Sequence, residues 1–180
     1  MPSTTPIRLP YQLLILTRAQ DDMWRKCDVS SACRDENIMK GMPLVSITRL
    51  RVRSWRYLVP FIYFSLRSSR QAKVAEGNLA VSLLRDSNNA YWTRTVWTTE
   101  AAMKSFMLAG AHRRVMPRLL DWCDEAALVH WVQDSDREPD WEEAHRRLQQ
   151  EGRRSKVKHP SPDHEKYLIA EPKKGVPSRS

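Results

Sequence analysis

Hydrophobic and polar positions recur regularly between residues 42 and 134, and the pattern is weaker outside this range. Runs that alternate or are rich in β-branched side chains predict strands, and apolar spacings of three and four residues predict helices. The expected strands are residues 44–52, 78–85, 90–97 and 127–132. The expected helices are residues 55–75 and a second helical region in two stretches, 98–109 and 111–125. The middle of the chain therefore follows the order strand–helix–strand–strand–helix–strand.

This order is that of the ferredoxin-like split βαβ arrangement, in which a four-stranded antiparallel sheet carries both helices on one face. The sequence therefore predicts an α+β fold. Residues 78–85 and 90–97 are apolar or aromatic on both sides of their expected strands. Because the helices cover one face of the sheet, the second face needs a partner. We therefore predict a homodimer in which two sheets pack face to face.

The two ends of the chain differ from its middle. Residues 1–41 show no sustained period and are expected to be a flexible extension. Their one apolar cluster is too short for the core of a signal peptide, and no run approaches the roughly 18 apolar residues of a membrane-spanning helix. Residues 135–180 contain an Asp140–Glu143 capping box, which predicts a helix over 140–151 followed by a basic flexible tail. These features favour a cytoplasmic protein with one folded domain over residues 42–134.

Composition and charge limit the classes of binding partner that the sequence favours. The chain has 180 residues, 41% hydrophobic and 28% charged, as an ordinary globular protein has. Its net charge of +9 is spread over all parts, without a helix-turn-helix, RNA-binding or zinc-finger pattern, so no nucleic acid partner is expected. The basic stretch Arg49–Arg56 precedes an apolar helix with Trp55 and Phe61. Such a segment leaves open a peripheral contact with an anionic membrane, although a solvated face explains it as well.

Part of the chain resembles a known superfamily. The residues that carry the resemblance are Asn89-Ala-Tyr-Trp-Thr-Arg-Thr-Val-Trp97, then Thr-Glu-Ala-Ala-Met-Lys-Ser-Phe106, and the step Gly110-Ala-His-Arg113. Together with the order of elements, they resemble the dimeric α/β-barrel superfamily over about residues 43–133, especially its antibiotic-biosynthesis-monooxygenase-like and spheroidene-monooxygenase-like families. The resemblance implies a dimeric α/β barrel. It implies no single activity, because the superfamily includes cofactor-free monooxygenases, haem-binding enzymes, haem-degrading enzymes and members with no known reaction.

His112 is the leading candidate for a functional residue. It lies in line with Val115 and Leu119, at the head of the apolar stripe of its expected helix. A histidine there can move a proton in a pocket between sheet and helices, or bind the iron of a haem, a cofactor that the resemblance allows. His112 is thus the expected catalytic residue and metal ligand, and the alternative is a histidine at a helix start that bonds to the backbone. His130, in the middle of a strand, is expected to be structural.

Two tryptophans and an arginine complete the candidate site. Trp92 and Trp97 can line a flat, conjugated ligand or a haem, although filling the core is the simpler role. Arg94 is unusual inside a strand, where it either meets a carboxylate or anchors an anionic group such as a haem propionate. Alternation along the strand places Trp92 and Arg94 on one side and Trp97 on the other. Arg94 is the second expected catalytic residue, and the two tryptophans are expected cofactor contacts.

Two hypotheses about function result. The first is a monooxygenase-like protein that binds an apolar or conjugated small molecule, with haem as the cofactor that the resemblance allows. The second is a non-catalytic dimer of the same fold that binds a small ligand or has a structural role. Three cysteines at unrelated spacings exclude a disulfide scaffold and a Cys-x-x-Cys metal cluster, and Cys123 is expected to be buried and unreactive.

Overall fold

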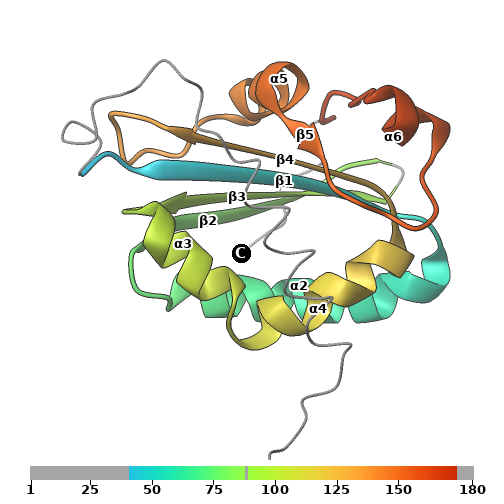
Figure 1. The fold of residues 1–180 in the computed structure, drawn as a ribbon, viewed down its shortest axis with the longest axis horizontal. Coiled ribbons are helices and arrows are strands. Elements are labelled where there is room, and N and C mark those ends of the chain that lie inside the picture. The colour runs from blue at the N-terminus through green and yellow to red at the C-terminus, as the bar shows by residue number, and fades with distance from the viewer. Residues whose placement is uncertain (1–40, 88, 174–180) are drawn as a thin grey trace, which may run out of the picture. The chain divides into compact units, whose positions relative to one another are not determined.

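The computed structural model describes residues 41–87 and 89–173, so all but the last residue of the expected extension 1–41 lies outside the described residues. Within them the chain forms a five-stranded antiparallel sheet of order β2-β3-β1-β4-β5 (Figure 1). The strands are β1 (Leu44–Val52), β2 (Asn78–Arg85), β3 (Ala90–Trp97), β4 (Cys123–Val132) and β5 (Arg153–Arg154). The helices are the 3-10 turn η1 (Trp55–Tyr57), α2 (Leu58–Lys73), α3 (Glu100–Met107), α4 (Gly110–Trp122), α5 (Trp141–Glu151) and α6 (Pro162–Lys166).

The predicted α+β fold is confirmed. β1 to β4 and the helices between them follow the split βαβ order of a ferredoxin-like domain, and α5 is the expected additional helix. Strand β4 begins at Cys123 and not at residue 127, because a register shift between Arg51 and Val52 extends the pairing of β1 as far as Cys123. The two-residue β5 adds a fifth strand beside β4, which the sequence pattern did not predict.

Side-chain caps mark the starts of three helices, α3, α5 and α6, of which the first two show the pattern. The Thr99 hydroxyl accepts a hydrogen bond from the backbone N–H of Ala102 (3.1 Å) at the start of α3. The Asp140 carboxylate accepts one from the backbone N–H of Glu143 (2.8 Å) at the start of α5. Each bond satisfies a donor that the first turn of a helix leaves without an intrahelical partner. The capping pattern in the sequence therefore places the start of α5 correctly.

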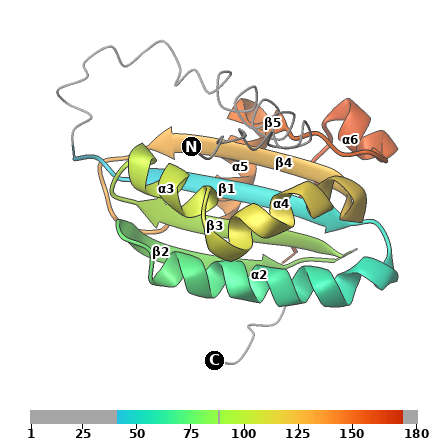
Figure 2. The ribbon, with the colours of Figure 1, turned by 60° about the horizontal axis from the view of Figure 1, so that its bottom comes forward.

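Alternation along the strands gives the sheet two different faces. In its register, Ile47 lies beside Arg94 and Val129, whereas the next residue, Thr48, lies beside Thr93. Helices α2, α3 and α4 lie over the face that carries Thr48, and α5 and α6 lie over the face that carries Ile47, as Figures 1 and 2 show. We call the first the three-helix face and the second the C-terminal face.

Packing is tight on the C-terminal face. Ala144 and Leu148 of α5 and Val45 and Ile47 of β1 are all 0% exposed in one cluster there. The buried cluster also contains Trp92, Val96, Ala127, Val129, Trp131 and Ile169. Full burial of one aliphatic side chain stabilises the fold by about 1.5–3 kcal/mol. The chain's own C-terminal segment therefore closes the apolar second face of the sheet.

This segment contradicts one expectation and removes the argument for another. The sequence predicts a basic flexible tail after residue 151, but β5 pairs with β4, and Ile169 is buried in the core. The expected face-to-face dimer rests on a second sheet face that nothing in the chain covers. Because α5 and the residues after it cover that face, this reason for the dimer does not hold, and a dimer requires another surface.

Candidate functional site

The sheet separates the four residues that the sequence singled out. Trp97 belongs to the three-helix face, and His112 lies in α4, one of the helices over that face. Trp92 and Arg94 belong to the C-terminal face, since Arg94 pairs in register with Ile47. The structure therefore brings Trp97 and His112 to one side of the sheet and places Trp92 and Arg94 on the other. The four residues do not form one site.

Arg94 holds the loop that leads into α5. Its Nη2 lies 2.5 Å from Glu138 Oε2, and its Nη1 donates to the carbonyl of Pro139. Its guanidinium also lies over the ring of Trp141, 4.3 Å from the ring centroid. The carboxylate-binding alternative for Arg94 is thus what the contacts show, and its positive charge is matched within the fold.

Contacts with the backbone fix the orientation of the His112 ring. Its Nδ1 lies 3.1 Å from the carbonyl oxygen of Met107. Because a carbonyl only accepts hydrogen bonds, we assign the ring proton to Nδ1, which leaves the lone pair on Nε2. The backbone N–H of His112 donates to Gln71 Oε1 (3.2 Å), which ties this end of α4 to α2. The backbone-bonded role expected as the alternative is therefore present, and it leaves one ring nitrogen for chemistry.

Two aromatic contacts connect His112 with the sheet. Its ring lies 4.8 Å from the ring of Phe106, which in turn stacks on Trp97 at 5.1 Å between centroids. The Trp97 indole N–H donates to Thr95 Oγ1 (2.8 Å) on the same face of β3. Burial lowers the pKa of His112 below its ordinary value. At neutral pH the imidazole is therefore uncharged and able to accept a proton.

The three-helix face is less completely buried than the C-terminal face. On the central strand β1, Val45 and Ile47 are 0% exposed, whereas Ser46 and Thr48, which point to the three-helix face, are only half-buried. The same holds for Thr93 of β3. We call the polar residues of this face, Ser46, Thr48, Thr93, Thr95 and His130, the polar floor. Ser46, Thr48 and Thr93, in the middle of the sheet, therefore stay partly accessible to solvent beneath three helices.

Two hydroxyl groups on this side are buried without a partner among the described residues. They are Ser68 Oγ of α2 and Tyr91 Oη of β3. Ser68 belongs to the inward stripe of α2, at a spacing of seven and four from the buried Phe61 and Ala72, and the Phe61 ring packs on Tyr91 at 4.9 Å. A buried polar group without a hydrogen bond costs about 1–3 kcal/mol. Both hydroxyls are therefore polar groups whose hydrogen-bonding capacity the described fold does not use.

Sequence reasoning missed the polar floor. Ser46 and Thr48 alternate with Val45 and Ile47, and Thr93 falls on the same side of the sheet, so the period-two pattern already puts hydroxyl groups on one face. That pattern was the available signal. The pattern alone does not mark a site, because serine and threonine are ordinary strand residues and their half-burial is visible only in the folded chain.

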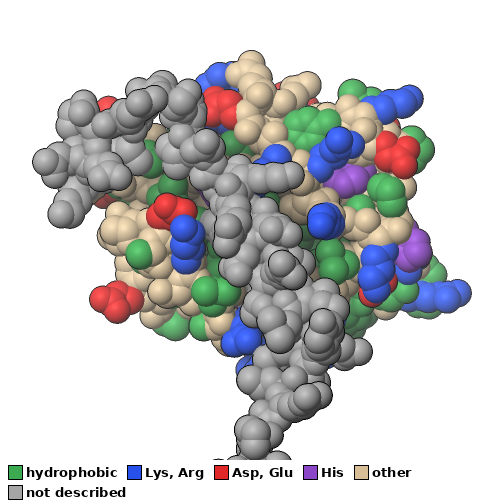
Figure 3. All heavy atoms as spheres, in the orientation of Figure 1, with side chains coloured by type: hydrophobic (Ala, Val, Ile, Leu, Met, Phe, Trp, Pro, Cys, Tyr) green, Lys and Arg blue, Asp and Glu red, His purple; other side chains and the backbone are tan. Residues whose placement is uncertain are grey.

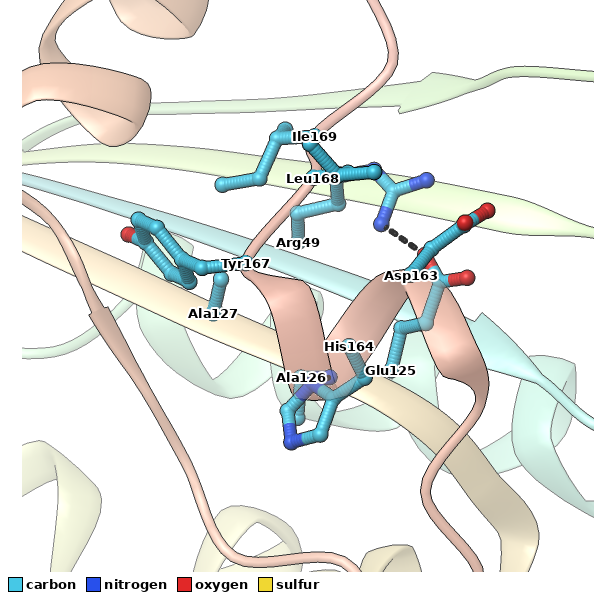
Figure 4. A pocket seen from close by; sticks show the side chains of 9 residues that line it. All are labelled: Arg49, Glu125, Ala126, Ala127, Asp163, His164, Tyr167, Leu168 and Ile169. Atoms are coloured by element: carbon cyan, nitrogen blue, oxygen red, sulfur yellow. Dashed lines mark hydrogen bonds and ion pairs between the residues drawn. The ribbon is translucent and has the colours of Figure 1, made fainter.

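A second group of polar residues lies on the C-terminal face (Figure 4). Arg49 of β1 pairs with Glu125 of β4 (2.5 Å), which also accepts from Arg51 (2.7 Å) and from the Ser161 hydroxyl (3.1 Å). The cavity beside this network, under Tyr167 and other residues of the C-terminal segment, has a volume of about 10 Å³. Such a volume holds about one water molecule. We therefore interpret this network as structural, fastening the C-terminal segment to the sheet.

The residues expected to hold a haem do not suit one. His112, the expected iron ligand, and Arg94, the expected propionate anchor, lie on opposite sides of the sheet, and Arg94 is engaged by Glu138. Trp92 and Trp97 are separated in the same way. We therefore assign no role to haem.

Comparison with protein families identifies the family to which the chain belongs. Residues 66–156, just over half of the 180 residues, match the family described as "Domain of unknown function (DUF3291)". The chain belongs to this family. DUF3291 lies in the superfamily of antibiotic-biosynthesis-monooxygenase-like proteins, so the superfamily predicted from the sequence is confirmed. The match extends through α5 and β5 and ends before α6, so only the first part of the cover of the C-terminal face belongs to the region shared with the DUF3291 family.

Solved structures similar to the chain have low sequence identity to it. They include SnoaB, a cofactor-independent oxygenase from Streptomyces nogalater (16% identity, 53% of this chain and 94% of that one, TM-score 0.42). A second is Rv0793 from Mycobacterium tuberculosis, with 9% identity over 51% of this chain and 94% of that one and a TM-score of 0.47. A third is PA3566 from Pseudomonas aeruginosa, with 11% identity over 53% of this chain and 98% of that one and a TM-score of 0.47. At these values the similarities carry no argument about activity. No curated protein sequence matches the chain.

Proposed function

We propose that this DUF3291 protein binds a small aromatic molecule on the three-helix face and oxidises it as a monooxygenase-like enzyme. The observation that carries the proposal is the half-burial of Ser46, Thr48 and Thr93 of the polar floor, with His112 in the helix layer above the same face. Central strands covered by helices are ordinarily closed to solvent, as Val45 and Ile47 are on the opposite face. The open side therefore supports a site for a ligand.

The residues on this side favour a particular ligand chemistry. Thr48 and Thr93 are direct neighbours in the register of β1 and β3, so their side chains stand roughly 5 Å apart. Two such hydroxyls can hydrogen-bond oxygen substituents at the edge of a flat molecule. Phe61 of α2 and Phe106 of α3 supply apolar rings from the helix side. We infer an aromatic ligand that is apolar on its ring faces and carries hydroxyl or carbonyl oxygens.

His112 supplies the base in this proposal. Since its Nδ1 proton is directed at Met107, its Nε2 accepts the proton of an activated C–H or O–H of the ligand. The resulting anion is electron-rich and reacts with dioxygen. For an activated methylene the reaction balances as CH2 + O2 → C=O + H2O, so that one oxygen atom enters the product, the other leaves as water, and no external reductant is consumed.

The non-catalytic hypothesis also places the ligand on the three-helix face, and it differs from the enzyme hypothesis in whether dioxygen is consumed. A ligand-binding protein would bind the aromatic molecule without consuming dioxygen. The Nε2 atom of His112, for which no hydrogen-bond partner is found among the described residues, favours the enzyme, because a base needs an unengaged lone pair. A homodimer, which the superfamily resemblance implies, would have to form through a surface other than the C-terminal face.

The experiment uses a dihydroxyanthrone, a flat molecule with two hydroxyls and an activated methylene. Its binding is measured by tryptophan fluorescence without dioxygen, and its oxidation is measured with an oxygen electrode. We expect His112→Ala to bind it with little change and to slow dioxygen uptake by about 10²–10⁴-fold. The control is His159→Ala, which removes an exposed histidine and should change neither quantity.

A second variant tests the floor itself. Thr48→Val combined with Thr93→Val removes two hydroxyls at nearly constant volume and should weaken binding by about 30-fold, since each lost hydrogen bond costs about 1 kcal/mol. Absence of binding by the unchanged protein would refute the proposal. Binding with dioxygen uptake no faster than the spontaneous rate would establish the non-catalytic alternative.

A further inference from the structure

The basic residues near the start of the described chain separate into two groups. Residues 41–75 contain seven Arg or Lys and no Asp or Glu. Arg49 and Arg51, which the sequence suggested as part of a basic surface, are paired with Glu125 and Asp124 on the C-terminal face. That part of the expectation was wrong. The remaining basic residues lie mainly on η1 and α2, at the opposite side of the molecule from α5 (Figure 1).

The outward side of α2 carries apolar side chains that face solvent. Val59, Tyr63 and Leu66 follow one another at spacings of four and three, and are 77%, 53% and 49% exposed. Trp55 of η1 and Val74, just after the helix, extend this row at its two ends and are 77% and 85% exposed. The inward stripe of the same helix is occupied by other residues, so these side chains are not needed for the core. Contiguous exposed apolar residues of this kind mark an interaction surface.

Exposed basic side chains lie among these apolar ones. They are Arg56, Arg67, Arg70 and Lys73, and none of them forms an ion pair with another described residue. On α5, by contrast, Arg146 and Arg147 pair with Glu143 of the same helix. Helix α4, which packs beside α2, adds the exposed Arg113, Arg114 and Arg118. In Figure 3, Lys and Arg side chains interleave with hydrophobic ones at the right, where Figure 1 places the end of α4.

We propose that this surface, formed by Trp55, Val59, Tyr63, Leu66 and Val74 with Arg56, Arg67, Arg70 and Lys73, docks on the surface of an anionic lipid bilayer. Helix α2 lies along the edge of the helix layer (Figure 2), so it can lie flat on a membrane. Its apolar side chains then enter the boundary between headgroups and acyl chains, and its basic ones meet lipid phosphates. No helix in the described part of the chain is long and apolar enough to cross a membrane.

The chemistry of the surface disfavours two other occupants. A second copy of the chain docked symmetrically would bring these basic side chains against the same basic side chains of its partner. A nucleic acid would match the charge, but it offers no apolar phase for Val59 and Leu66. A bilayer with anionic lipids provides both. This inference concerns a surface outside the proposed ligand site and does not depend on the oxidation chemistry.

The test measures sedimentation of the full chain with vesicles of phosphatidylcholine, with and without phosphatidylserine. We expect binding only when phosphatidylserine is present, and its loss when salt is raised from about 0.1 M to about 1 M, which shortens the screening length from about 10 Å to about 3 Å. Arg70→Gln combined with Lys73→Gln should lower the partition constant about 25-fold, or roughly fivefold per charge. The matched control, Lys156→Gln with Lys166→Gln, removes two exposed charges from the C-terminal segment and should change it by less than about twofold.

Val59→Ser combined with Leu66→Ser tests the apolar part at constant charge and should also weaken binding. Both residues are exposed, so the variants are expected to fold, and circular dichroism confirms this. The proposal is overturned if anionic vesicles do not sediment the protein, if the serine variant binds as the unchanged chain does, or if both charge variants lose binding equally. Salt-sensitive binding of a single-stranded RNA oligonucleotide without vesicle binding would assign the surface to nucleic acid instead.

Discussion

Replacing Leu148 by Ala is expected to lower the free energy of unfolding by about 3 kcal/mol. The Leu148 side chain is 0% exposed and packs from α5 into the cluster that contains Ile47 and Trp92. The replacement removes three carbon atoms and leaves a cavity that the sheet can fill only in part, and such Leu→Ala changes cost about 2–5 kcal/mol. The backbone carbonyl that accepts from the Tyr167 hydroxyl is retained, so the loss reports packing alone.

The assay is thermal and denaturant unfolding followed by circular dichroism. For a chain of this length, about 3 kcal/mol corresponds to a decrease in Tm of roughly 6–12 °C. Leu168→Ala is the matched control, since Leu168 lies in the same C-terminal segment but is 55% exposed, and it should cost less than about 0.5 kcal/mol. Equal and small effects of the two replacements would refute the conclusion that α5 covers the sheet.

Two further predictions concern titration and reactivity. Burial, followed by the charge of Arg153, lowers the pKa of His130 from 6.5 to about 4, so between these values only the unfolded chain binds the proton. The free energy of unfolding therefore falls by up to about 3 kcal/mol as the pH drops through this range, and denaturant titrations should find that His130→Gln loses this part of the slope. Burial raises the pKa of Cys123 to about 12, so with Cys27 and Cys33 changed to Ser, a thiol reagent should label only the unfolded protein.

The elements of residues 44–132 were predictable because their patterns are local. Alternating or β-branched runs form β1, β2 and β3, and the Asp140 cap starts α5 where the sequence places it. The fold class follows from the order of these elements. The boundary between α4 and β4 was misplaced by four residues, because the pairing of Val52 with Cys123 across the sheet decides it.

The cover of the C-terminal face was not predictable in the same way. Tyr167 and Ile169 stand as isolated apolar residues in a charged segment, with no period to mark them. Their burial depends on the Tyr167 hydrogen bond to α5 and on the ion pair of Arg49 with Glu125 beneath them, which join parts of the chain far apart in sequence. Composition alone therefore suggested a flexible tail and an uncovered sheet.

The candidate site was predictable in part. The sequence identified His112 and Trp97, which the structure connects through Phe106. It also included Trp92 and Arg94, although alternation already assigned them to the other side of β3. Which side faces the three helices could not be deduced from one strand, because both sides of β3 carry large aromatic residues. Only the assembled sheet shows that the hydroxyl-bearing side remains partly open.

The location of the ligand site is tested most directly by the indole N–H resonances of a ¹⁵N-labelled protein during titration with dihydroxyanthrone. Trp97 lies on the three-helix face, with its indole bonded to Thr95, whereas Trp92 and Trp131 are buried on the C-terminal face. Our account predicts that the Trp97 resonance shifts with ligand concentration while those of Trp92 and Trp131 stay in place. Shifts of Trp92 and Trp131 with an unchanged Trp97 resonance would contradict it.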